Sequence, residues 1–183
     1  MSLHVAPDGW IDAARRIHSP NCDARPVEAS VELLVIHNIS LPPGEFGGDS
    51  IERLFTNRLD PDAHPYFKSL AGVRVSAHFL IDRAGELTHF VACGERAWHA
   101  GASRWRGRER CNDYSVGVEL EGTDLITYTD RQYARLAALT RALLVAYPIR
   151  SIAGHSEVAP NRKTDPGPGF DWARYLVAIA YTH

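Results

Sequence analysis

Short apolar runs separated by turn-forming residues recur along the chain and predict a β-sheet. Residues 31–36 are nearly all apolar and rich in β-branched side chains, which is typical of a strand buried on both faces. Residues 78–82 and 86–91 are two further apolar runs, and the three residues between them include a glycine, which is typical of a β-hairpin. Two more strands are expected over residues 115–120, where apolar and polar positions alternate, and over residues 150–155.

Apolar residues recur at helical spacing in three places. The clearest helix is predicted over residues 130–146, where Thr129 can cap the N-terminus and a proline soon after the last residue ends the helix. Asp49 or Ser50 can cap a short helix, and Asp171 can cap a terminal one. The apolar positions are Ile51, Leu54 and Phe55 in the short helix, Tyr133, Leu136, Ala137, Thr140, Leu143 and Leu144 in the long helix, and Trp172, Tyr175, Leu176 and Ile179 in the terminal helix.

These elements predict an α+β (mixed α/β) fold, because the strands are separated by both a hairpin and helices. We expect a central mixed β-sheet flanked by helices. The length of 183 residues suits one domain with a substantial core, and no repeat or linker interrupts it, so one domain is expected over residues 1–183 with its core at about 9–177. Residues 38–48 and 59–74 show too little periodicity to place, and either could move as a lid.

The composition and net charge of the chain indicate which classes of partner are not expected. The chain is 45% hydrophobic and 23% charged, the balance of an ordinary globular protein, and its formal net charge is -2. A nucleic-acid or anionic-membrane partner would call for a clustered basic surface, so neither is expected. The start of the sequence lacks a basic head followed by an apolar run, and the three cysteines form no CxxC pair. We therefore expect a cytoplasmic protein. We also expect a monomer.

Two histidines lie where apolar runs meet polar loops rich in glycine and proline. These are His37 and His155, and Asp165 follows ten residues after the second. Two histidines and an aspartate form a plausible three-ligand zinc site that leaves one position for water, as in catalytic zinc centres. Their spacing alone is not a local signature, and most histidines are not ligands. A competing set, His78, His89 and His99, lies in the middle of the chain, and we interpret its members as sheet histidines.

Two further residues could supply catalytic groups beside such a metal. If Val118 and Leu120 face the core, Glu119 faces the opposite side of its strand and could take a proton from an attacking water. Lys163 lies two residues before Asp165, and its ammonium could stabilise an oxyanion. From the residues alone, a solvent-facing strand glutamate and a solvated loop lysine are the more common interpretations.

Several long strings of this sequence resemble the AmpD-type amidases, which are cytoplasmic zinc N-acetyl-anhydromuramyl-L-alanine amidases of cell-wall recycling. They belong to a wider group that includes peptidoglycan recognition proteins. The resemblance extends over about residues 9–175, and the strings agree in order and at compatible spacing. The strings that carry it are LLVIHNISLPPGEFGG, RVSAHFLIDRAGE, RAWHAG, GRERCNDYSVGVELEGTD and GHSEVAPNRKTDPGPGFDW.

The resemblance implies roles for particular residues and a peptidoglycan recognition protein-like amidase fold. His37, His155 and Asp165 match the family's ligands for one Zn²⁺ per chain. Glu119 matches the residue that activates the zinc-bound water, and Lys163 the lysine that polarises the scissile carbonyl. The implied substrate is an anhydromuramyl-peptide. The positions that match the substrate groove are Asn38, Arg74, Trp98 and Arg110.

Two alternatives to a recycling amidase remain open. An amidase that cuts the intact wall would share the same chemistry but would act on polymeric murein, so activity on whole sacculi distinguishes it. A binding module would lack part of the metal set, whereas all three candidate ligands are present in this chain.

Overall fold

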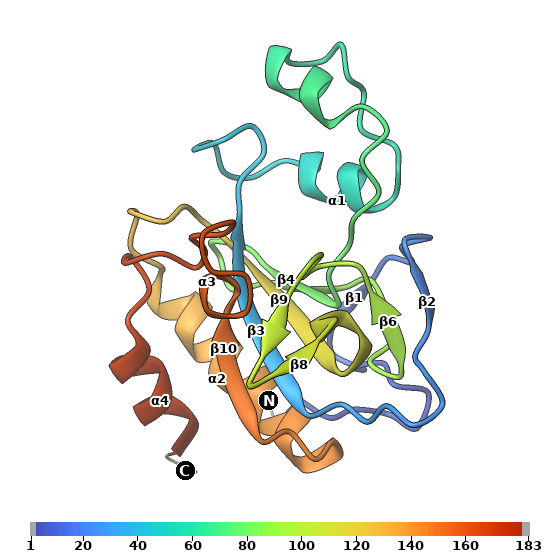
Figure 1. Cartoon of the computed structure of the whole chain (residues 1–183). Coiled ribbons are helices and arrows are strands. Elements are labelled where there is room, and N and C mark those ends of the chain that lie inside the picture. Colours follow the sequence, from blue (N-terminus) through green and yellow to red (C-terminus); the bar gives the residue numbers. More distant parts are fainter. Residues whose placement is uncertain (1–2, 181–183) are drawn as a thin grey trace.

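The centre of the computed structural model, which describes residues 3–180, is a six-stranded mixed sheet (Figure 1). The two ends of the expected domain, residues 1–2 and 181–183, lie outside the described residues. The strand order is β1-β5-β4-β9-β3-β10, with β4 and β5 antiparallel and the other neighbours parallel. The strands are β1 (Arg15–Arg16), β3 (Leu33–Ile39), β4 (Phe79–Ile81), β5 (Leu87–His89), β9 (Ser115–Glu121) and β10 (Ser151–Gly154).

Helices and two small antiparallel pairs surround this sheet. Strands β2 and β6 form one pair, and β7 and β8 the other. Figure 1 shows α2 and α4 together on one side of the sheet, while α1 and the green segment after it project from one end. The bounds are β2 (Cys22–Ala24), β6 (Glu95–Ala97), β7 (Arg104–Trp105), β8 (Arg108–Glu109), α1 (Ser50–Phe55), α2 (Asp130–Ala146), α3 (His155–Val158), α4 (Trp172–Ala180) and the 3₁₀ helices η1 (Pro65–Leu70) and η2 (Cys111–Asp113).

Strand β3 is covered on both faces, which explains why it is apolar throughout. Leu34 and Ile36 pack in the large core cluster together with α2 and α4. Leu33 and Val35 point the other way, into a smaller cluster with residues of β10 and α3. Because side chains alternate along a strand, His37 continues the second face, away from α2.

The predicted mixed sheet, its hairpin and its long helix are confirmed. Helix α2 begins and ends at the predicted residues. The Thr129 side chain accepts a hydrogen bond from the Gln132 backbone N–H, and the Gln132 side chain accepts one from the Thr129 N–H, so the two residues form a capping box. The apolar stripe of α2 is buried except at Leu144, which is 41% exposed.

Some predicted boundaries were wrong, and several elements were not predicted. Strand β3 continues through His37 to Ile39, and β10 ends at Gly154, so that His155 is the first residue of α3 rather than the last of a strand. The five strands β1, β2, β6, β7 and β8 have two or three residues each, which is too short to show a period. Within residues 3–180, no helix has the length and apolar character needed to cross a bilayer.

His89 is a buried histidine that fastens the N-terminal segment to the sheet. Its Nδ1 accepts a hydrogen bond from the Ile11 backbone N–H at 3.2 Å, and its Nε2 donates to the Val91 carbonyl at 2.8 Å. Burial lowers the pKa of His89 to about 3. The ring is therefore neutral in the folded protein over the whole range in which a histidine in water gains its proton.

Acid should therefore destabilise the fold partly through His89. The unfolded chain binds a proton at this residue near pH ~6.5 and the folded chain only near pH 3, so its contribution to stability is present above pH ~6.5 and is lost as the pH falls. Replacing His89 with Asn, which retains an acceptor for Ile11, should reduce the slope of unfolding free energy against pH by about 1.4 kcal/mol per pH unit between pH ~4 and ~6. Urea denaturation at a series of pH values measures both slopes, and equal slopes would contradict the prediction.

Candidate metal centre

The ends of three neighbouring strands bring the candidate residues together. Strands β9, β3 and β10 are adjacent and parallel, so their carboxyl ends share one edge of the sheet, where α/β proteins commonly place their sites. His37 lies near the end of β3, and Glu119 is its register partner on β9. His155 follows β10 directly, and Asp165 comes from the loop after α3.

Three of these side chains converge on one point. The Nδ1 atoms of His37 and His155 are 2.9 Å apart, and Asp165 Oδ2 lies 3.2 Å from the first and 3.0 Å from the second. All three residues are buried. In the part of the chain that the structure describes, no other three side chains of histidine, cysteine, aspartate or glutamate converge in this way.

The charges of this cluster fit a metal cation. Burial, together with the neighbouring His155, lowers the pKa of His37 to about 4, so its ring is neutral near pH 7. Burial alone would raise the pKa of Asp165, but the neighbouring His155 and His37 outweigh it and hold that pKa well below its ordinary value. Two imidazole nitrogens and one carboxylate oxygen are donors that suit zinc, and three protein ligands leave a position for water or substrate.

Asn38 fastens the loop that carries Asp165 to the end of β3. Its side-chain amide donates to the Pro166 carbonyl at 3.2 Å and to Asp124 Oδ1 at 2.8 Å. Asp165, the candidate aspartate ligand, comes from a loop, so this contact helps to define where its carboxylate lies relative to His37.

Glu119 is buried beside the cluster rather than facing solvent. It is 9% exposed, and its Oε2 has no hydrogen-bond partner within the described residues. Burial, and then the negative charge of Asp165, raise the pKa of Glu119 well above its ordinary value, while Lys163 opposes the shift. A buried, unpartnered carboxyl costs free energy, and such groups are commonly found where a proton must be exchanged.

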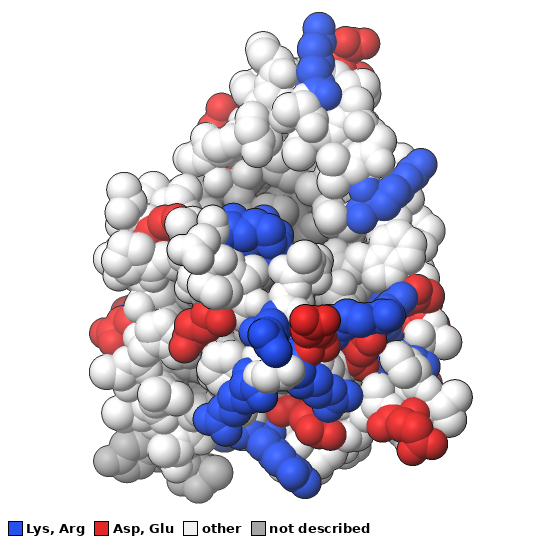
Figure 2. Space-filling model, in the orientation of Figure 1, with Lys and Arg blue, Asp and Glu red and all other residues white. Residues whose placement is uncertain are grey.

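A pocket of about 340 Å³ opens onto these residues. Figure 2 shows a hollow on this face, between the projecting part of the molecule and its body. Lys163 is exposed and lines the pocket together with Asn38, Trp98 and Glu119. Trp98 is only partly buried, and its indole N–H donates to Asp23 Oδ1 at 3.2 Å, which holds the ring at the wall.

The two arginines expected in the groove do not line this pocket. Arg110 lines an adjacent hollow of about 520 Å³ and pairs with Asp113, with Nε 3.0 Å from Oδ2. Arg74 is exposed in the segment before β4. Figure 2 shows basic side chains gathered below the main hollow, mixed with acidic ones. The structure therefore places Asn38 and Trp98 in the same pocket as His155 and Asp165, whereas neither arginine lines that pocket.

Several residues that the sequence did not single out for this site also contribute to it, and four of them come from distant segments. Phe55, Tyr66 and Val75 line the pocket, and they come from α1, from η1 and from the segment before β4. His99, interpreted from the sequence as a sheet histidine, instead lies outside the strands, with Nδ1 2.9 Å from His37 Nε2. No local pattern marks these positions, because their proximity to the site depends on contacts between distant segments.

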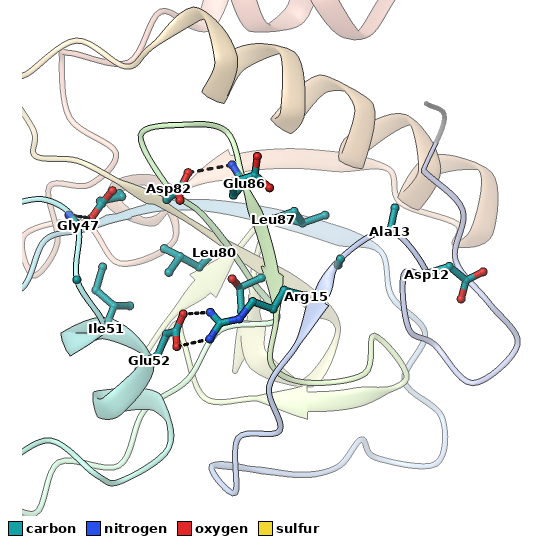
Figure 3. A pocket seen from close by; sticks show the side chains of 14 residues that line it. Asp12, Ala13, Arg15, Gly47, Ile51, Glu52, Leu80, Asp82, Glu86 and Leu87 are labelled. Atoms are coloured by element: carbon teal, nitrogen blue, oxygen red, sulfur yellow. Dashed lines mark hydrogen bonds and ion pairs between the residues drawn. The ribbon is translucent and has the colours of Figure 1, made fainter.

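A separate hollow of about 500 Å³ lies beside β1, β4 and β5 (Figure 3). Five of its fourteen lining residues are acidic, and Arg15 and Glu52 form an ion pair at its wall. Among residues 3–180, no histidine or cysteine lines it. The hollow therefore does not compete with the cluster of His37, His155 and Asp165 as a candidate metal centre.

Comparisons with known proteins identify relatives over nearly the whole chain. The family model described as N-acetylmuramoyl-L-alanine amidase matches residues 27–168. The chain is 58% identical over 174 residues to the 1,6-anhydro-N-acetylmuramyl-L-alanine amidase AmpD of Escherichia coli K12, covering 94% of this chain and 95% of that protein. The corresponding protein of Haemophilus influenzae is 47% identical, with 93% and 95% covered.

Solved structures agree with this relationship. The crystal structure of a selenomethionine AmpD derivative superposes with a TM-score of 0.92 at 57% identity, covering 94% of this chain and 97% of that one. A more distant match is the Escherichia coli amidase AmiD in complex with anhydro-N-acetylmuramic acid-L-Ala-D-γ-Glu-L-Lys. Its TM-score is 0.61 at 27% identity, covering 97% of this chain and 65% of that one.

Proposed function

The chain belongs to the N-acetylmuramoyl-L-alanine amidase family, and from this premise we propose that it hydrolyses the lactyl amide between 1,6-anhydromuramic acid and L-alanine in soluble peptidoglycan fragments. The observation that carries the proposal is the convergence of His37, His155 and Asp165 beside the buried Glu119, in a pocket open to solvent. The relatives named as anhydro-muramyl amidases extend over almost the full chain, which supports this substrate class and a role in cell-wall recycling.

The proposed cofactor is one zinc ion per chain, held by His37, His155 and Asp165. Zinc in a site with an open position supplies Lewis acidity, which lowers the pKa of a water molecule from about 16 to ~7 and polarises a carbonyl oxygen. The protein's part is to keep two imidazole nitrogen donors and one carboxylate close together. The distances of 2.9–3.2 Å among these atoms support this assignment.

Glu119 and Lys163 are the proposed catalytic residues. Glu119 takes a proton from the attacking water and delivers it to the nitrogen of L-alanine as the amide bond breaks, so that one water yields a carboxylate and an amine. The raised pKa of Glu119 suits this exchange, because a carboxylate that is more basic than usual takes up a proton from water more readily. The Lys163 ammonium lines the same pocket and stabilises the oxygen that becomes negative during the attack.

The substrate groove extends outward from this centre. Trp98 offers an aromatic face to the sugar or its lactyl arm. Asn38 orients the amide region, and Arg74 and Arg110 are proposed to pair with carboxylates of the stem peptide as forked donors. Their positions outside the pocket are consistent with contacts to a peptide that leaves the centre along the surface.

The proposed substrate is a soluble peptidoglycan fragment, which bears on the compartment in which the enzyme acts. We propose that it acts as a monomer in the cytoplasm, with neither nucleic acid nor membrane as a partner. A matched assay on intact sacculi and on soluble anhydromuramyl-tripeptide tests this proposal. Turnover of the fragment alone supports a recycling enzyme, and equal turnover of both would indicate a wall-cutting amidase.

Removal of the carboxylate ligand should abolish both metal binding and turnover. We expect Asp165→Ala to lose its stoichiometric zinc and its hydrolysis of anhydromuramyl-tripeptide, because two ligands cannot hold the ion as three do. Metal analysis and product detection by chromatography measure the two effects. Asp12→Ala, in the separate hollow beside β1, is the control and should retain both. Active, zinc-loaded Asp165→Ala would show that the ligand set is wrong, and wild-type protein without zinc or turnover would indicate a binding module.

Replacement of Glu119 by Gln should remove proton exchange while leaving shape and metal intact. We expect kcat to fall by about 10²–10⁴, with zinc content unchanged. Glu121→Gln is a matched control, because Glu121 is buried on the same face of β9 but accepts hydrogen bonds from the backbone of Gly47 and Arg83. That variant should lose stability rather than kcat. Full turnover by Glu119→Gln would rule out the role assigned to Glu119.

A further inference from the structure

We propose that His99 and Ala100 form a positioning element that holds both metal-binding imidazoles with Nδ1 toward the metal. This inference rests on the proposed zinc site. A neutral imidazole has one N–H and one lone pair, and only the lone pair can bind a metal. Something must therefore keep the hydrogen on Nε2 of His37 and of His155, and the structure shows a partner for each.

A chain of hydrogen bonds determines which nitrogen of His37 carries the hydrogen. The Ser115 hydroxyl donates its only hydrogen to the Cys111 carbonyl at 2.6 Å, so its oxygen accepts from His99 Nε2 at 3.1 Å. With its N–H used there, the neutral His99 ring presents a lone pair at Nδ1. This atom accepts from His37 Nε2 at 2.9 Å. The remaining nitrogen of His37, Nδ1, then directs its lone pair at the candidate metal centre.

Ala100, the residue after His99, determines which nitrogen of His155 carries the hydrogen. His155 Nε2 lies 3.2 Å from the Ala100 carbonyl oxygen, which can only accept a hydrogen bond. The hydrogen of His155 is therefore on Nε2, and Nδ1 is free. Asn112 Oδ1 accepts from the backbone N–H groups of both His99 and Ala100, at 3.2 and 2.8 Å, and so holds the two partners together.

The sheet also leaves room for the His99 ring. A Cβ at Gly117 in β9 would lie only 2.5 Å from Cγ of His99, so the ring packs directly on the backbone of the strand. A glycine is required at this position for the ring to reach His37. Gly117→Ala should therefore displace the His99 ring, although it removes none of the groups that form the hydrogen bonds from Cys111 to His37.

Zinc affinity, measured in the full-length protein by competition with a chelator, tests the proposal. His99→Leu removes the acceptor for His37 and should weaken zinc binding by about 10–100-fold, the usual effect of losing such an outer partner. Gly117→Ala should weaken it similarly. His99→Asn should restore most of the affinity, because its Oδ1 can occupy the position of the histidine Nδ1. His89→Leu, which removes a buried histidine away from the site, should bind zinc as the wild type does.

A second measurement does not depend on any variant folding correctly. In the wild-type protein with imidazole ¹⁵N labels, His37 and His155 should carry their hydrogens on Nε2, with or without zinc. A scalar coupling should also be detectable across the hydrogen bond between His37 Nε2 and His99 Nδ1. A hydrogen on Nδ1 of His37 in the metal-free protein would overturn the proposal, as would unchanged zinc affinity in folded His99→Leu. Failure of the wild type to bind zinc would instead refute the proposed metal site itself.

Discussion

The parallel pairing of β9, β3 and β10 is the constraint on which the rest of the site depends. These strands end at one edge of the sheet, and their alternation sends one set of side chains to α2 and α4 and the other set to the opposite face. The first set is apolar and forms the main core. A slip of one residue in β3 would turn His37 toward α2 and would remove Leu34 and Ile36 from that core. The burial of Leu34 and Ile36 thus determines where His37 points.

The centre contains groups that would be unfavourable in an ordinary core. Glu119 is buried without a partner for Oε2 among the described residues, and two imidazole nitrogens face each other at 2.9 Å. Each arrangement weakens the metal-free fold, because a buried polar group without a partner costs about 1–3 kcal/mol. A cation between the nitrogens and the carboxylate would remove the second difficulty and would favour ionised Glu119. Proteins commonly retain such local conflicts where they bind ligands or carry out chemistry.

The sequence was most informative where the pattern is local. Helix α2 was predicted to the residue, because its capping box, apolar stripe and terminal proline all lie within the segment. The hairpin of β4 and β5, the buried strand β3 and the strand β9 were predicted for the same reason, although the full burial of β9 was not. Strands such as β1 and β7 have two residues each and owe their existence to neighbours distant in the chain. For the site, the sequence offered two sets of histidines as candidate ligands, and the resemblance favoured the set of His37, His155 and Asp165. The contact of His99 with His37 could not be predicted, because it depends on tertiary structure.

The candidate ligands lie far apart along the chain, so metal binding at this site would depend on folding. His37 and Asp165 are 128 residues apart, so the three donors can meet only after β3, β10 and the loop after α3 have been assembled. The unfolded chain offers no comparable site, and a metal that binds only the folded state stabilises it by mass action. The supports of the ligands are equally dispersed: Asn38 holds the loop of Asp165, and Asn112 holds His99 and Ala100. The metal affinity that we propose is therefore a property of the whole sheet edge rather than of three side chains.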